Sequence, residues 1–143
     1  MRTTGLVALV LVLPLLAGCG GKDYCATVQA RQSQLGSISD AGSPTGALQA
    51  LPILEELEAK APDDVHHDYQ LVLSRIEALQ SALHRAGVDP ASYDPAHPPA
   101  GLSSADRRQL RDAAAHLAAS DTVQALAAVQ QEVLDVCHTP LEV

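Results

Sequence analysis

The longest regular pattern in this chain is a row of apolar residues between Val65 and Leu83. Their spacing alternates between four and three residues, as in Val65, Tyr69, Val72, Ile76, Leu79 and Leu83. Residues at that spacing share one face of an α-helix, so the row predicts a helix of about 24 residues that buries one face. Gly87 and Pro90 follow the row, and both residue types are typical of a helix end.

Composition extends this prediction to the rest of the chain. Of the 143 residues, three are Tyr and none is Phe or Trp, whereas strands favour aromatic and β-branched residues. Ala and Leu dominate, and both favour helices. We therefore expect a single all-α domain, a four- to five-helix antiparallel bundle. The other expected helices cover residues 23–35, 43–60, 103–118 and 120–137.

Turn and cap residues set the limits of these segments. Gly36-Ser37 is expected to end the first helix, and Ser43-Pro44 to begin the second with Ser43 as N-cap. Ser103 and Asp106 form a capping signature for the fourth. The last helix is expected to bury a stripe made of Val123, Leu126, Ala127, Gln130, Val133, Leu134 and Cys137.

Charge and motifs exclude several functions. The chain has 9 basic and 17 acidic residues, a formal net charge of −8, which argues against a nucleic-acid partner. It has no Gly-x-Ser-x-Gly, no His-Glu-x-x-His and no phosphate-binding loop. We therefore expect a protein that is not an enzyme and needs no cofactor.

Residues 1–18 have the form of a secretory signal peptide. Arg2 precedes an apolar run from Gly5 to Gly18 that ends in small residues. This run is shorter than the roughly 20 residues that a membrane-spanning helix needs. The stretch Leu16-Ala17-Gly18-Cys19 closely resembles the lipobox of bacterial lipoproteins. The alternative is an ordinary secreted protein with a coincidental cysteine.

The lipobox resemblance implies an anchor and a domain plan. Cys19 would become the first mature residue and carry a thioether-linked diacylglycerol whose acyl chains, such as palmitate, enter the membrane. The plan is then a lipoprotein signal peptide over 1–18, a lipidated cysteine and short linker over 19–22, and the helical bundle over 23–143. The protein would lie lipid-anchored at the outer face of the cytoplasmic membrane.

With Cys19 lipidated, two cysteines remain. Outside the cytoplasm, Cys25 and Cys137 are expected to form a disulfide. The alternative is a metal pair completed by His138, which neither a Cys-x-x-Cys nor a His-x-x-x-His motif supports.

The expected disulfide constrains the topology. It joins the start of the first helix to the end of the fifth, and in a strict up-down bundle of five full helices these points lie at opposite ends. Residues 88–102, with four prolines, are long enough to run the length of the bundle, at about 3 Å per residue. We expect this segment to cross over along the side. The alternative is that the first or second helix is too short to count as a full pass.

The densest group of possible metal ligands lies at the start of the long helix. Asp63, Asp64, His66, His67 and Asp68 include oxygen and imidazole donors that suit Zn or Mn. However, Pro62 and the two acids that follow it are expected in the first helical turn, where negative charge complements the helix dipole. We favour this solvated arrangement and expect no metal site.

Beyond the lipobox, the chain resembles small helical lipoproteins of actinobacterial type. The resemblance rests on LAGCGGKDYC at residues 16–25, on the Ala-Pro-x-[Asp/Glu]-Val pattern at residues 61–65, and on a last helix that ends in Cys137. Such proteins are mostly uncharacterised, so the resemblance implies no activity. The expected function is a non-enzymatic module that binds another envelope protein or has a structural role. The alternative is an accessory lipoprotein that binds a small ligand or a metal.

Overall fold

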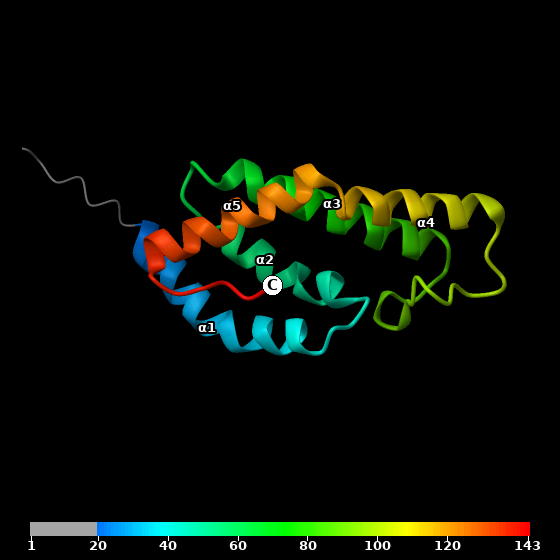
Figure 1. Cartoon of the computed structure of the whole chain (residues 1–143), viewed down its shortest axis with the longest axis horizontal. Helices are drawn as coiled ribbons and strands as arrows, with labels where there is room; N and C mark the ends of the chain where they lie inside the picture. Colours follow the sequence, from blue (N-terminus) through cyan, green and yellow to red (C-terminus); the bar gives the residue numbers. More distant parts are fainter. Residues whose placement is uncertain (1–19) are drawn as a thin grey trace, which may run out of the picture.

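The computed structural model describes residues 20–143, and within that range it contains five α-helices, one 3-10 helix and no strand (Figure 1). The expected signal peptide and Cys19 lie outside the described residues. The all-helical prediction is confirmed. The elements are α1 (Gly20–Asp40), α2 (Gly46–Glu58), α3 (His66–Arg85), η1 (Pro90–Ser92), α4 (Ser104–Leu117) and α5 (Ser120–Cys137).

Helix α1 is longer than expected at both ends. Gly20–Lys22, expected as a linker, forms its first turn, and the helix passes through Gly36 and Ser37 to Asp40. The expected stop at Gly36 is wrong, because the helix continues through this residue. A Cβ atom there would lie 2.9 Å from Oε2 of Glu142, in the C-terminal segment that crosses this helix.

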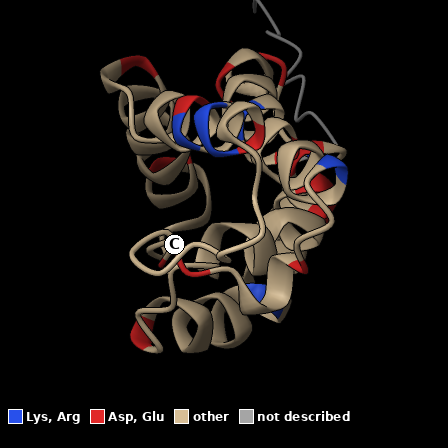
Figure 2. Ribbon diagram, turned by 90° about the vertical axis from the view of Figure 1, so that its right-hand side faces the viewer, with Lys and Arg blue, Asp and Glu red and all other residues tan. Residues whose placement is uncertain are grey.

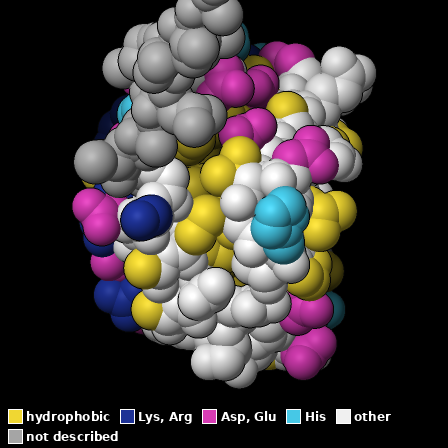
Figure 3. All heavy atoms as spheres, turned by 90° about the vertical axis from the view of Figure 1, so that its left-hand side faces the viewer, with side chains coloured by type: hydrophobic (Ala, Val, Ile, Leu, Met, Phe, Trp, Pro, Cys, Tyr) yellow, Lys and Arg dark blue, Asp and Glu magenta, His cyan; other side chains and the backbone are white. Residues whose placement is uncertain are grey.

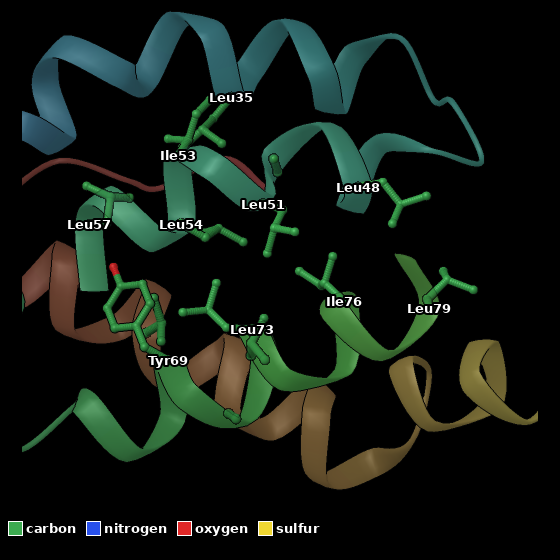
Figure 4. Close-up of a cluster of buried hydrophobic side chains, with 14 of the residues drawn as sticks. Leu35, Leu48, Leu51, Ile53, Leu54, Leu57, Tyr69, Leu73, Ile76 and Leu79 are labelled. Carbon is green, nitrogen blue, oxygen red and sulfur yellow. The ribbon is translucent and has the colours of Figure 1, made fainter. Parts of the chain in front are cut away.

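Helix α2 begins at Gly46, with Thr45 as its N-cap, so the expected start at Ser43-Pro44 is wrong by two residues. The Ser43 hydroxyl accepts a hydrogen bond from the Thr45 backbone N–H at 3.2 Å and orders the turn before the helix instead. Pro52 lies within α2 on its exposed side. The opposite side packs on α3, and Leu51 and Leu54 lie opposite Leu73 and Ile76 (Figure 4).

The expected row on the long helix is confirmed. All six of its residues, from Val65 to Leu83, are buried. Helix α3 begins later than expected, however, at His66, and Asp63 and Asp64 lie in the turn before it. Gly87 adopts φ +68°, and the N–H groups of Gly87 and Val88 bond to the carbonyls of His84 and Leu83. This is a Schellman motif, which needs a residue in the left-handed conformation.

Helices α4 and α5 follow one another along α3. Both contact α3, only Ala118 and Ala119 separate them, and Figure 1 shows them end to end along the same side of the molecule. Nη2 of Arg75, in the middle of α3, lies 3.4 Å from Asp121 at the start of α5. The two short helices therefore lie end to end along α3.

The expected crossover of residues 88–102 is wrong. This segment stays at the end of the molecule where α3 ends and α4 begins (Figure 1), and its helix η1 contacts α2 and α3. Tyr93 and Leu102 are buried there. Because α4 and α5 lie end to end along α3, the start of α1 and the end of α5 come to the same end of the molecule without a long connection.

The expected disulfide is present. Cys25 and Cys137 are bonded, with Cα atoms 5.2 Å apart and a separation of 112 positions in sequence. Beside the bond, the hydroxyls of Tyr24 and Tyr69 share a hydrogen bond of 2.7 Å, and both rings are buried. Burial is the main cause that raises the pKa of both tyrosines, so both stay protonated at neutral pH. This pair links α1 to α3.

The buried face of α5 differs from the expected stripe. Thr122, Ala125, Val129 and Val133 are buried. Val133 belongs to the expected stripe and confirms that part of it, whereas the other three each stand one position before a member of the stripe. Val123 is 56% exposed and Leu134 is 46% exposed. One position turns a helix face by about 100°. The rotation arises because α5 packs on both α3 and α1, and the small residues of this face let α5 approach both.

The disulfide is expected to supply much of the domain's stability. Replacing both cysteines, as Cys25→Ser with Cys137→Ser, should lower the free energy of unfolding by up to about 4–5 kcal/mol, because the reduced chain regains the entropy of a long loop. Urea denaturation of the double variant and of the wild type measures the loss. A reductant should weaken the wild type and leave the double variant unchanged; equal stability of the two proteins would contradict the prediction.

The orientation of α5 can be tested with two neighbouring residues. Val133→Ala removes a side chain with 0% exposure and should cost about 2 kcal/mol of unfolding free energy. Leu134→Ala, at 46% exposure, should change it by no more than about 0.5 kcal/mol. Thermal unfolding of both variants gives the comparison. The stripe expected from the sequence contains both residues, so a comparably large loss for Leu134→Ala would support that stripe.

Candidate functional site

The described part of the chain forms an apolar cavity of ≈270 Å³ that is partly open to solvent. Helix α1 contributes its last turns to the wall, α2 its first turns, and α3 its middle. The remaining wall comes from the junction of α4 with α5 and from Val143 in the C-terminal segment. The cavity therefore lies where all five helices come near one another, and each helix supplies at least one lining residue.

Small residues create this space. Ala47, Ala50 and Leu54 recur at i, i+3 and i+7 and so share one stripe of α2 that lines the cavity. Gly42 and Gly46, on either side of the turn between α1 and α2, also line it. Gly42 has φ +56°, a conformation that glycine adopts without strain. The short side chains leave a volume that larger residues would fill.

The lining is aliphatic with a few hydroxyls. None of the described residues in the wall carries an ionisable or aromatic side chain. The hydroxyl of Thr122 donates to the carbonyl of His116 at 2.8 Å, and that of Ser43 is bonded to Thr45 at 2.9 Å. Ser39 lies on the exposed side of the wall. The cavity can therefore bind a molecule by apolar burial, with hydroxyl groups available at one end.

The C-terminal segment forms one side of the cavity. His138, at φ 54°, ends α5 in the left-handed conformation, and the chain then turns back between α5 and α1 (Figure 1). The side chain of Gln32 donates to the carbonyl of Pro140, and that of Gln130 donates to the carbonyl of Leu141, both at 3.3 Å. Leu141 is buried. The sequence predicted the helix end at His138 but gave no sign that the tail would pack, beyond the apolar residue Leu141 after Pro140.

The candidate metal ligands are not brought together. Nδ1 of His66 lies 3.1 Å from Oε1 of Glu58 on α2, whereas Asp63, Asp64 and His67 are exposed. Within residues 20–143, no group of three or more His, Cys, Asp or Glu side chains has the geometry to hold a metal ion. The candidate site depended on all these residues lying in one helix. Because Asp63 and Asp64 precede α3, they do not share a helix face with the others.

Acidic groups do meet at the end of the molecule that holds the disulfide. The pKa of Glu132 on α5 is raised, first by partial desolvation and then by the charges of Asp64 and Asp135. Viewed from the opposite end, Lys and Arg are conspicuous on one helix (Figure 2). Helix α4 carries Arg107, Arg108 and Arg111. Charge is thus placed on the outside, while the described residues that line the cavity carry none.

A second feature is apolar surface on α5. Val123, Leu134 and Val136 are 56%, 46% and 39% exposed. Figure 3 shows hydrophobic side chains on the end face of the molecule where α1 begins and α5 ends. Leu134 and Val136 lie close together near the end of α5, whereas Val123 lies near its start. No helix in residues 20–143 is both long enough and apolar enough to cross a membrane.

Comparison of the chain with protein-family models, with curated proteins and with solved structures finds no match. The function is therefore inferred from the residues and from the geometry of the cavity.

Proposed function

We propose that this chain is a lipid-anchored protein of the bacterial cell envelope that binds a small apolar molecule without transforming it. The observation that carries the proposal is the aliphatic cavity of ≈270 Å³ among the helices. Ligand sites in proteins are concave, mostly apolar and largely pre-formed, with volumes from about 300 Å³ upward. This cavity lies at the lower limit of that range, which suits a small ligand.

The chemistry of the wall supports binding rather than catalysis. General acid–base and nucleophilic catalysis need an ionisable or activated group within hydrogen-bond reach of the substrate. The described lining offers hydroxyls of serine and threonine and otherwise aliphatic carbon. No base lines the cavity beside these hydroxyls, so we place the protein among binding proteins.

The anchor in this proposal is Cys19. Its support is the resemblance of Leu16-Ala17-Gly18-Cys19 to a lipobox. The disulfide between Cys25 and Cys137 fits the same location, because such bonds persist outside the reducing cytoplasm. Since α1 begins at Gly20, the helical domain would follow the lipid directly and lie at the outer face of the cytoplasmic membrane.

We also propose that the helices form an antiparallel bundle of four passes: α1, α2, α3, and α4 together with α5. The contacts of α1 with α2, of α2 with α3, and of α3 with both later helices support this arrangement. An even number of passes returns the chain to the end where it began, which suits the disulfide. The cavity would then lie in the interior of the bundle.

A module that binds an envelope protein is the second candidate. The exposed apolar residues Val123, Leu134 and Val136 on α5 favour it. The two functions would use partly different surfaces. Val123 lines the cavity, whereas Leu134 and Val136 lie further along the helix and remain available to a partner. A partner could therefore dock on α5 while the cavity holds a ligand.

The anchor predicts a specific covalent product. Intact-mass and peptide analysis of protein from the native membrane should show a mature chain that begins at Cys19 and carries a diacylglycerol group. Cys19→Ala should lose that added mass and the cleavage before residue 19, because the lipid needs the thiol. An unmodified Cys19 thiol in the native protein would contradict the anchor.

The cavity predicts saturable binding of a small apolar molecule, and a larger side chain in the cavity wall should abolish that binding. Lipidated protein in phospholipid nanodiscs should take up radiolabelled decanol, decanoate or naphthalene beyond uptake by empty nanodiscs, at no more than one molecule per chain. Ala50→Leu places three additional carbon atoms in the wall and should reduce this excess at least tenfold. Ala115→Leu makes the same change on the exposed side of α4 and should leave it unchanged.

Two outcomes would count against ligand binding. Either none of the three probes shows excess uptake, or Ala50→Leu takes up as much as the wild type. In both cases the apolar surface of α5 becomes the better candidate site.

A further inference from the structure

We propose that the ligand is an uncharged, flexible aliphatic amphiphile with about ten to twelve carbon atoms, the class of a medium-chain alcohol or its neutral derivatives. Its chain would fill the cavity and its polar end would lie beside Ser39. This inference rests on the proposed function, since it names the ligand class of the same cavity. Volume, wall chemistry, charge and the state of the hydroxyls each contribute one step.

The volume sets the length of the chain. An apolar protein cavity of about 150 Å³ accommodates one benzene molecule of six carbons. In proportion, the ≈270 Å³ cavity has room for about ten to twelve carbon atoms. A two-chain phospholipid is therefore too large to be enclosed, and a single short chain fits.

The walls favour an aliphatic chain over a ring system. The chain's aromatic residues are three tyrosines, namely Tyr24, Tyr69 and Tyr93, and none of them lines the cavity. Aromatic ligands gain from offset-stacked or edge-to-face contacts with aromatic side chains, and this site offers none. Side chains of Leu, Ile, Val and Ala from several helices form the walls, and a flexible chain can follow their surface.

Charge disfavours an anionic polar end. No Lys, Arg or His side chain is among the described lining residues. Arg75 stands between the lining residues Val72 and Ile76 in sequence, but its guanidinium faces Asp121 at 3.4 Å. A carboxylate at the cavity would lose hydration without gaining a free cation. The net charge of −8 adds long-range repulsion of anions.

The hydroxyls decide the direction of the ligand. Thr122 already donates its proton to the carbonyl of His116, so its hydroxyl cannot also donate to a ligand. Ser39 and Ser43 lie at the turn between α1 and α2, where Ser39 is exposed to solvent and Ser43 is half-buried. Because the Ser43 hydroxyl is already hydrogen-bonded to Thr45, the polar end of the ligand would point to Ser39, where that hydroxyl and water can solvate it.

The test measures binding of decanol, decanoate and naphthalene to the lipidated protein in nanodiscs. Uptake of each probe by nanodiscs that carry the Ala50→Leu variant is subtracted as background. Decanol should bind at least tenfold more tightly than decanoate at pH 8 and than naphthalene. Shorter and longer alcohols should locate the optimum near ten to twelve carbons. Ser39→Ala should weaken decanol about two- to tenfold, the usual effect of losing one hydrogen bond, and leave naphthalene unchanged.

The outcomes separate this inference from the function on which it rests. If naphthalene or decanoate binds as tightly as decanol, and Ala50→Leu still abolishes the binding, the aliphatic or the neutral assignment is overturned while the cavity remains a binding site. If no probe shows uptake that Ala50→Leu removes, the proposed function itself is overturned. A preference for decanol that Ser39→Ala does not affect would overturn the assigned direction.

Discussion

The covalent bond between Cys25 and Cys137 fixes the frame in which the other contacts form. It holds the start of α1 against the end of α5 across 112 residues of sequence, and so removes most of the loop-closure entropy that the unfolded domain could regain. Tyr24, which directly precedes Cys25, shares a hydrogen bond of 2.7 Å with Tyr69, and this buried pair links α1 to α3. Covalent and polar restraints thus meet at one end of the molecule.

Away from that end, packing rather than covalent restraint holds the helices. Helix α3 is the central element, since it contacts α2, α4 and α5 and buries seven residues. Helices α4 and α5 contribute smaller side chains, and α4 buries only Leu110. The cavity lies where this thin face meets the alanines of α2.

The same arrangement explains how a small domain could hold a ligand without a catalytic group. Its charges lie on the outside, where Arg31 pairs with Glu56 at 2.8 Å and Arg75 with Asp121 at 3.4 Å. The tail that follows the disulfide turns back and covers one side of the cavity through bonds to Gln32 and Gln130. Helix α5 therefore connects the three parts: it supplies lining residues, it carries Cys137 of the disulfide, and the tail follows it.

The sequence by itself determined the helical class, the buried row on α3, the cap at Ser103 and the cysteine pair, because each of these depends on local spacing or on residue type. It did not determine which face of α5 is buried, since neighbouring stripes on that helix are both apolar and only simultaneous contact with α3 and α1 selects one. Nor could it show that α4 and α5 lie end to end along α3, which removed the need for a crossover of residues 88–102. The cavity likewise belongs to the tertiary structure: its walls come from five helices and the tail, and a void is defined by how distant segments fail to fill the space between them.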